Sequence, residues 1–83
     1  MVKSNLISLT KMHSGYSGVV VEIQGGFGLI SRLNPLGIMP GKKITKVSSM
    51  LGQGPVTVEV DRAQLAIGFG MANKIMVKLD PVI

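Results

Sequence analysis

The 83-residue sequence contains no cysteine and no tryptophan, and only two phenylalanines and one tyrosine. Without cysteine the chain has no disulfide framework and no thiolate metal site, which suits the reducing cytosol. So few aromatic rings furnish a base-stacking surface poorly, which argues against a nucleic-acid partner. No apolar run approaches the roughly 20 residues of a membrane span, and no signal-peptide pattern is present. These absences favour a cytoplasmic domain without a membrane span of its own.

Charged residues are also scarce, at 16% of the sequence, and they are unbalanced. Nine lysines and arginines stand against four acidic residues, which gives a net charge of +5 and favours anionic partners. Hydrophobic residues make up 46% of a chain that is short enough to have only a small core. We therefore expect one domain over residues 1–83, with exposed apolar surface that docks to a partner and also allows weak self-association.

Alternation of apolar and polar residues predicts five short strands. They cover residues 16–24, 43–49, 56–61, 63–67 and 75–79. Ile44 and Val47 fall on opposite faces of an ideal strand, so we expect a bulge or a tight bend between them. Asp61 and Arg62 are short enough for a hairpin turn. Residues 5–9 form an apolar lead-in, residues 50–55 a glycine-rich connection and residues 68–73 a single helical turn.

Residues 27–36 break the strand pattern, because their leucines and isoleucine recur at spacings of one, three and three. Such spacing predicts about two turns of amphipathic helix. Pro35 is expected to distort this helix or to end it near Asn34. Gly37 is expected to be its left-handed cap, and Pro40-Gly41 a turn into the next strand.

These elements together predict a mainly β fold, a five-stranded, strongly bent barrel with one short helix after the first long strand. The expected core consists of apolar strand and helix residues: Val19 or Val20, Ile23, Leu33, Leu36, Val56, Val58, Val60, Leu65, Ile67, Ile75 and Val77.

No catalytic, metal or cofactor site is expected. The single histidine, His13, lies in a predicted turn without partners at ligand spacing. Glu59 and Asp61 share a strand face, but two carboxylates make a poor cation cage. The six methionines are better explained by core filling or an adaptable docking surface than by a soft-metal site. The basic cluster of Lys42, Lys43 and Lys46 has the charge to touch phosphates.

Four blocks of sequence, in this order, resemble the FeoA family of ferrous-iron-transport accessory proteins. The blocks are Gly15-x-x-Gly18-x-Val20 with Ile23-x-Gly25-Gly26, Arg32-Leu33-x-x-Leu36-Gly37-Ile38-x-Pro40-Gly41, Gly54-Pro55 before an alternating strand, and Leu65-Ala66-Ile67-Gly68-x-Gly70-x-Ala72-x-x-Ile75-x-Val77. The chain departs from the family at Pro35, where a helix former is usual, and at Gly68 and Gly70, which replace an arginine-rich turn.

The resemblance implies an SH3-like barrel without enzymatic activity or a cofactor. It also implies a cytoplasmic protein, recruited to the inner face of the membrane, that acts on the G-protein region of the transporter FeoB. Its role there is either to regulate the nucleotide cycle or to help assemble the complex. The alternative function is a basic SH3-like module that binds RNA or DNA.

The expected docking surface combines large apolar side chains, methionines and one arginine, a composition typical of interface hot spots. Its residues are Phe27, Ile30, Arg32, Met39, Phe69 and Met71. The competing interpretation is that Phe27 and Phe69 plug the two ends of the barrel.

Overall fold

The computed structural model describes residues 6–49 and 52–81, so residues 5, 50 and 51 of the expected lead-in and connection lie outside it. The described residues form six strands, two α-helices and two 3-10 helices. In chain order these are β1 (Leu6–Ser8), η1 (Leu9–Lys11), β2 (Ser17–Ile23), α1 (Gly26–Leu33), η2 (Asn34–Leu36), β3 (Lys43–Ser49), β4 (Val56–Val60), β5 (Ala63–Ile67), α2 (Phe69–Ala72) and β6 (Ile75–Leu79).

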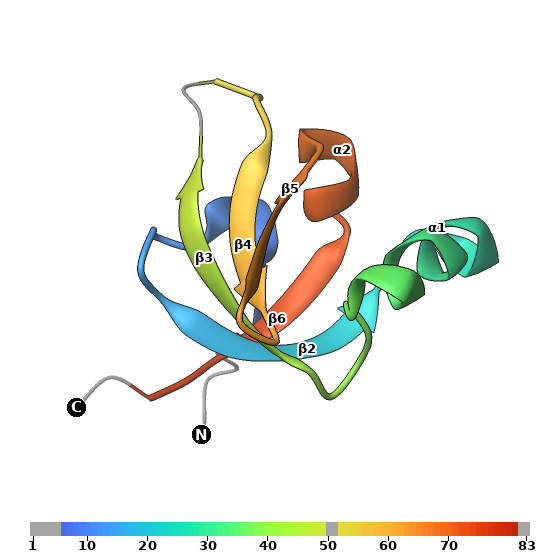
Figure 1. Cartoon of the computed structure of the whole chain (residues 1–83), viewed down its shortest axis with the longest axis horizontal. Helices are drawn as coiled ribbons and strands as arrows, with labels where there is room; N and C mark the ends of the chain where they lie inside the picture. The colour runs from blue at the N-terminus through green and yellow to red at the C-terminus, as the bar shows by residue number, and fades with distance from the viewer. Residues whose placement is uncertain (1–5, 50–51, 82–83) are drawn as a thin grey trace.

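The strands form one antiparallel sheet in the order β1-β6-β2-β3-β4-β5. Figure 1 shows the sheet curling around a single interior, with α1 projecting from one side. The five expected strands are present, and part of the lead-in adds β1, which pairs with β6. The result is the expected mainly β, SH3-like barrel, with six described strands and one helical excursion after β2.

Each of the two long strands contains a bulge that decides which side chains face the core. In β2 the pairing with β6 shifts between Val20 and Glu22, so Val21 is an extra residue. Val20 and Ile23 are therefore both buried, although an ideal strand would place residues three apart on opposite faces. The bulge expected in residues 43–49 is confirmed, since the pairing of β3 with β4 shifts between Lys46 and Ser48.

The helical segment ends in a Schellman cap centred on Gly37. The Gly37 N–H donates to the carbonyl of Asn34 (2.9 Å), and the Ile38 N–H donates to the carbonyl of Leu33 (3.1 Å). Gly37 has a φ of 85°, which only glycine adopts without strain, so the expected left-handed cap is confirmed. The α-helix itself ends at Leu33, one residue before Asn34, and η2 continues it through Pro35. Proline removes the N–H that another α-helical hydrogen bond would need.

This cap explains an error in the expected core. Leu36 was expected to be buried but is 47% exposed, whereas Ile38, after the cap, is fully buried beside Leu33 in the core cluster. Leu65 is only half-buried against the core. The sequence pattern also missed five buried apolar side chains: Leu9, Met12, Ile38, Ile44 and Ala72. Several of them lie in turns and short helices, where alternation gives no signal.

The turn between β4 and β5 is a two-residue hairpin, as expected. Val60 pairs with Ala63, and the two residues between them, Asp61 and Arg62, have φ values of 52° and 69°. Positive φ at both central positions is the signature of a type I′ turn. The expected helical turn before β6 is also present as α2.

Lys46 is the one buried charged residue among those described, with 2% of its surface exposed. Its Nζ donates hydrogen bonds to the carbonyls of Thr10 (3.0 Å) and Met12 (2.7 Å). The β3 side chain thus holds the segment around η1 against the barrel. Burial disfavours the ammonium ion and lowers the pKa of Lys46 below its usual value.

Candidate docking surface

The helical segment α1–η2 carries the two most exposed large apolar side chains among the described residues. Phe27 in the first turn of α1 is 83% exposed, and Leu36 at the end of η2 is 47% exposed. The inner face of the same segment packs Leu29, Ile30 and Leu33 against the core. Because both faces carry apolar residues, burial of the inner one leaves apolar area in water.

The first turn of α1 lies beside α2, and a hollow of about 360 Å3 separates them. Leu29 and Met71 give it apolar walls, Gly25 and Gly70 contribute backbone, and Lys74 stands at its edge. The hydrogen bond from the Gln24 N–H to the Lys74 carbonyl (2.8 Å) joins the two connections and fixes this arrangement.

The six side chains expected to dock fall into two groups. Phe27 and Arg32 are exposed on α1, whereas Ile30, Met39, Phe69 and Met71 are half-buried. Ile30 and Met71 also pack on the core. The hollow brings Met71 beside α1, and Met39 lies beyond the cap at the other end of the helical segment from Phe27.

The exposure of Phe27 bears on the competing interpretation. A side chain with 83% of its surface in water does not close the end of a barrel. The plugging role is therefore wrong for Phe27. Phe69 is half-buried at the start of α2, an exposure that fits either role.

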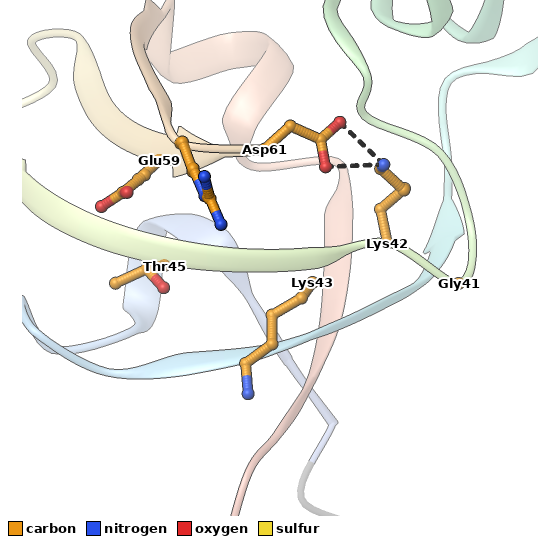
Figure 2. A pocket seen from close by; sticks show the side chains of 7 residues that line it. Gly41, Lys42, Lys43, Thr45, Glu59 and Asp61 are labelled. Carbon is orange, nitrogen blue, oxygen red and sulfur yellow. Dashed lines mark hydrogen bonds and ion pairs between the residues drawn. The ribbon is translucent and has the colours of Figure 1, made fainter.

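A second hollow, of about 310 Å3, lies beside β3 and the β4–β5 turn and is lined mainly by charged side chains. Figure 2 shows Lys42 reaching Asp61 there, with Nζ 2.8 Å and 2.7 Å from its two carboxylate oxygens. Lys43 points away and pairs with Asp80 (2.6 Å). A cation shared by Glu59 and Asp61 would have to displace Lys42.

The expected basic cluster is not available as a unit. Lys46 is buried, while Lys42 and Lys43 are engaged by carboxylates on different elements. Phosphate contact through these three lysines together would require breaking both ion pairs and exposing Lys46. Successive side chains of a strand point to opposite faces. Lys46 therefore shares the buried face of β3 with Ile44, whereas Lys43 lies on the exposed face.

The histidine and the acidic residues do not assemble a metal centre in the part of the chain that the structure describes. Within residues 6–49 and 52–81 no three His, Asp or Glu side chains lie together as a ligand set. His13 is exposed and its ring stands 5.6 Å from that of Tyr16. Over the same residues no helix has the length and hydrophobicity to cross a membrane.

Comparison with known proteins adds the functional context. A family model described as the FeoA domain matches residues 7–79. A protein of Methanocaldococcus jannaschii named as an Fe(2+) transport protein A is 36% identical over 64 residues, which cover 77% of this chain and 76% of that protein. The crystal structure of an iron uptake regulatory protein (FeoA) superposes with a TM-score of 0.81 at 35% identity, covering 89% of this chain and 96% of that one.

The same fold occurs inside a longer protein of a different kind. A manganese-dependent transcriptional repressor superposes with a TM-score of 0.82 at 19% identity, covering 95% of this chain but 44% of the repressor. At this identity the likeness concerns the barrel alone.

Proposed function

This chain belongs to the FeoA family, and we propose that it is a non-enzymatic accessory protein of ferrous iron transport that docks onto a FeoB-type membrane transporter. The docking site on the transporter is its cytoplasmic G-protein region. The protein accordingly acts in the cytoplasm and is recruited to the inner face of the membrane. It regulates the nucleotide cycle of the transporter or the assembly of the complex.

The observation that carries the proposal is the exposed Phe27 on a helix that is apolar on both faces. An exposed aromatic residue costs solvation free energy that a monomer does not recover. The same helix carries the exposed Arg32, and the half-buried Met71 lines the hollow between α1 and α2 together with Leu29. Both are residue types found at energetically important interface positions. This combination supports a role in protein binding better than a role in catalysis.

The test is the affinity of the purified chain for the isolated cytoplasmic region of the transporter. Phe27→Ala is expected to weaken binding by about 1–2 kcal/mol, which is roughly tenfold. Its free energy of unfolding should change by less than about 0.5 kcal/mol, because the side chain makes few contacts within the fold. Tyr16→Ala is the matched control, since it removes another exposed ring, which is 40% exposed. Tyr16 directly precedes the first residue of β2, whereas Phe27 follows its last, so the two rings lie at opposite ends of this strand.

Two outcomes would contradict the proposal. Absence of binding by the wild-type chain would remove the transporter as partner. Equal binding by wild type and Phe27→Ala would move the contact to another surface.

The alternative of an RNA- or DNA-binding module has less support. The three lysines that suggested it are buried or ion-paired, and Phe27 stands on a helix instead of beside a basic strand. Binding to the phosphates of RNA or DNA would weaken steeply with salt. An affinity for nucleic acid that changes little between low and moderate salt would therefore argue against this alternative.

A further inference from the structure

The hollow between α1 and α2 has the form of a receptacle for an apolar side chain. Its walls are the aliphatic Leu29 and the thioether of Met71, and its floor includes the backbone of Gly25 and Gly70. Methionine adapts its shape to the group that it contacts, at little energetic cost. A volume of about 360 Å3 leaves room for a large side chain of another molecule.

One cation borders this hollow and a second lies on the next turn of α1, and no ion pair engages either of them among the described residues. Lys74 lines it directly, and Arg32 lies one helical turn after Leu29 on α1. Both are exposed, and the two ion pairs found among the described residues involve other lysines, Lys42 and Lys43. Arg32 and Lys74 are therefore free to pair with carboxylates of another molecule.

The acidic residues of the chain are concentrated elsewhere. No Asp or Glu occurs in residues 23–58 or 62–79, which include both α-helices and η2. Asp61 and Asp80 are already bound by lysines. Glu22, on β2, is the nearest acid in sequence to α1, and it forms no ion pair with Lys74. The surface around the hollow is thus apolar at its centre and positive at its edge.

Two glycines leave helix backbone uncovered: Gly70, which lines the hollow, and Gly28, which precedes the lining residue Leu29 on α1. A Cβ at Gly28 or Gly70 would meet nothing within 4 Å, and neither residue has a positive φ. Neither backbone conformation nor packing within the described chain therefore requires glycine there. Each costs a helix about 1 kcal/mol relative to alanine. Their effect is to let a second molecule approach the backbone of both helices closely.

We propose that the occupant of this hollow is an acidic amphipathic segment of the partner protein, which inserts one large apolar side chain while its carboxylates pair with Arg32 and Lys74. This inference rests on the proposed docking function and specifies the chemistry of the partner. A second copy of this chain is a poorer occupant, because two molecules of net charge +5 repel each other and their edge cations would meet.

The experiment uses the isotope-labelled full chain and two short synthetic peptides, observed by amide chemical shifts. One peptide presents leucine and phenylalanine on one helical face with flanking glutamates, and the other replaces every glutamate by glutamine. The acidic peptide is expected to shift the amides of Leu29, Gly70 and Met71 and to bind about tenfold more tightly than the neutral one. Equal affinity of the two peptides, or shifts confined to other residues, would overturn the inference.

Variants of the chain separate the charge from the cavity. The double substitution Arg32→Glu with Lys74→Glu should weaken binding of the acidic peptide about tenfold or more. The control is Lys78→Glu, which reverses the charge of an exposed lysine at the other end of β6. Its affinity for the acidic peptide should stay within about twofold of that of the wild type. Gly70→Leu should also weaken binding, because its side chain would cover the hollow. Circular dichroism checks that each variant keeps its fold.

The same variants with the cytoplasmic region of the transporter distinguish the two proposals. If that region binds the wild-type chain and the charge-reversed chain equally, the inference is wrong and the docking function stands. If it does not bind at all while the acidic peptide binds in the hollow, the transporter is the wrong partner and the chemistry of the site stands.

Discussion

Gly37 is a single residue on which the path of the chain depends. Its φ of 85° closes the helical segment and turns Ile38 into the core. A Cβ there would also meet Asp61 Oδ2 at 3.3 Å and Val60 Cγ1 at 3.4 Å. Gly37→Val is therefore expected to lower the free energy of unfolding by about 1–3 kcal/mol, mainly through backbone strain. Gly37→Asn should cost less, because Asn tolerates this region of φ and ψ. Urea denaturation measures both, and identical midpoints for wild type and the valine variant would contradict the capping role.

Lys46 is the second residue with a structural role, and its amine is what matters. Lys46→Met keeps most of the aliphatic stem but leaves the carbonyls of Thr10 and Met12 without their donor. We expect a loss of about 1–3 kcal/mol at neutral pH, typical of unsatisfied buried polar groups. Hydrogen exchange should quicken first near η1. A variant as stable as wild type would show that water satisfies these carbonyls.

The pH dependence of stability supplies an independent test of Lys46. Its pKa in the folded chain lies below the usual 10.5, because burial disfavours the charged form. Between these two values the unfolded chain binds more protons, so the contribution of Lys46 to stability rises with pH. The penalty is fully present below the folded pKa and is gone above the unfolded one. The difference between wild type and Lys46→Met should therefore grow as pH rises through this window. Parallel profiles would contradict the shift.

At the residue scale, the sequence predicted the left-handed cap at Gly37 correctly, because the apolar spacing before it marked where the helix ends. A helical apolar spacing that stops before glycine has few structural solutions. Lys46 was not predicted, although it shares a strand face with Ile44 two residues earlier. A charged side chain is normally predicted to be exposed to solvent. The core accepts this amine because the carbonyls around η1 accept its hydrogen bonds, and their position is known only from the three-dimensional structure.

The β4–β5 hairpin is the element whose turn is least suited to its conformation. Arg62 adopts a φ of 69°, where glycine is strongly preferred in type I′ turns. Arg62→Gly should raise the free energy of unfolding by about 0.5–1 kcal/mol through relief of this strain. Arg62→Ala removes the same charge but keeps the Cβ, so it should give no such gain. A gain of equal size in both variants would assign the effect to charge instead of backbone conformation.

Among the elements, strand positions were predictable and bulge positions only partly so. The bulge in β3 was expected from Ile44 and Val47, but it lies at Val47, after Lys46. Ile44 and Lys46 therefore alternate regularly onto the buried face, and Val47 does not join them. The bulge in β2 was not expected, because Val19, Val20 and Val21 read equally well in either register. A run of identical side chains holds no register information, so pairing with β6 decides it.

For the molecule as a whole, the distribution of potential ligands predicts weak binding of iron. The acids and the histidine form no ligand set of three within the described residues, and Asp61 is held by Lys42. Ferrous iron should bind the isolated chain without fixed stoichiometry, if it binds measurably. Anaerobic titration calorimetry tests this. A one-to-one complex at low micromolar affinity that His13→Ala or Asp61→Ala abolishes would contradict it.

The barrel was predictable as a whole because five alternating segments and a short helix fit few architectures. The docking surface was predictable only as a composition. Phe27 and Arg32 were named from their residue types, but the hollow depends on bringing residue 25 to residue 74, a contact that no local pattern encodes. Lys74 was accordingly absent from the expected surface.

The pairing of β1 with β6 also has a mechanical consequence. Leu6 opposes Lys78, so the first described strand starts beside the place where the last one finishes. A force that pulls the two ends of this unit apart would load the hydrogen bonds between β1 and β6 one after another, as in opening a zipper, instead of shearing them together. Separation of β1 from β6 would begin at low force. The force would first rise where Lys46 donates hydrogen bonds to the carbonyls of Thr10 and Met12.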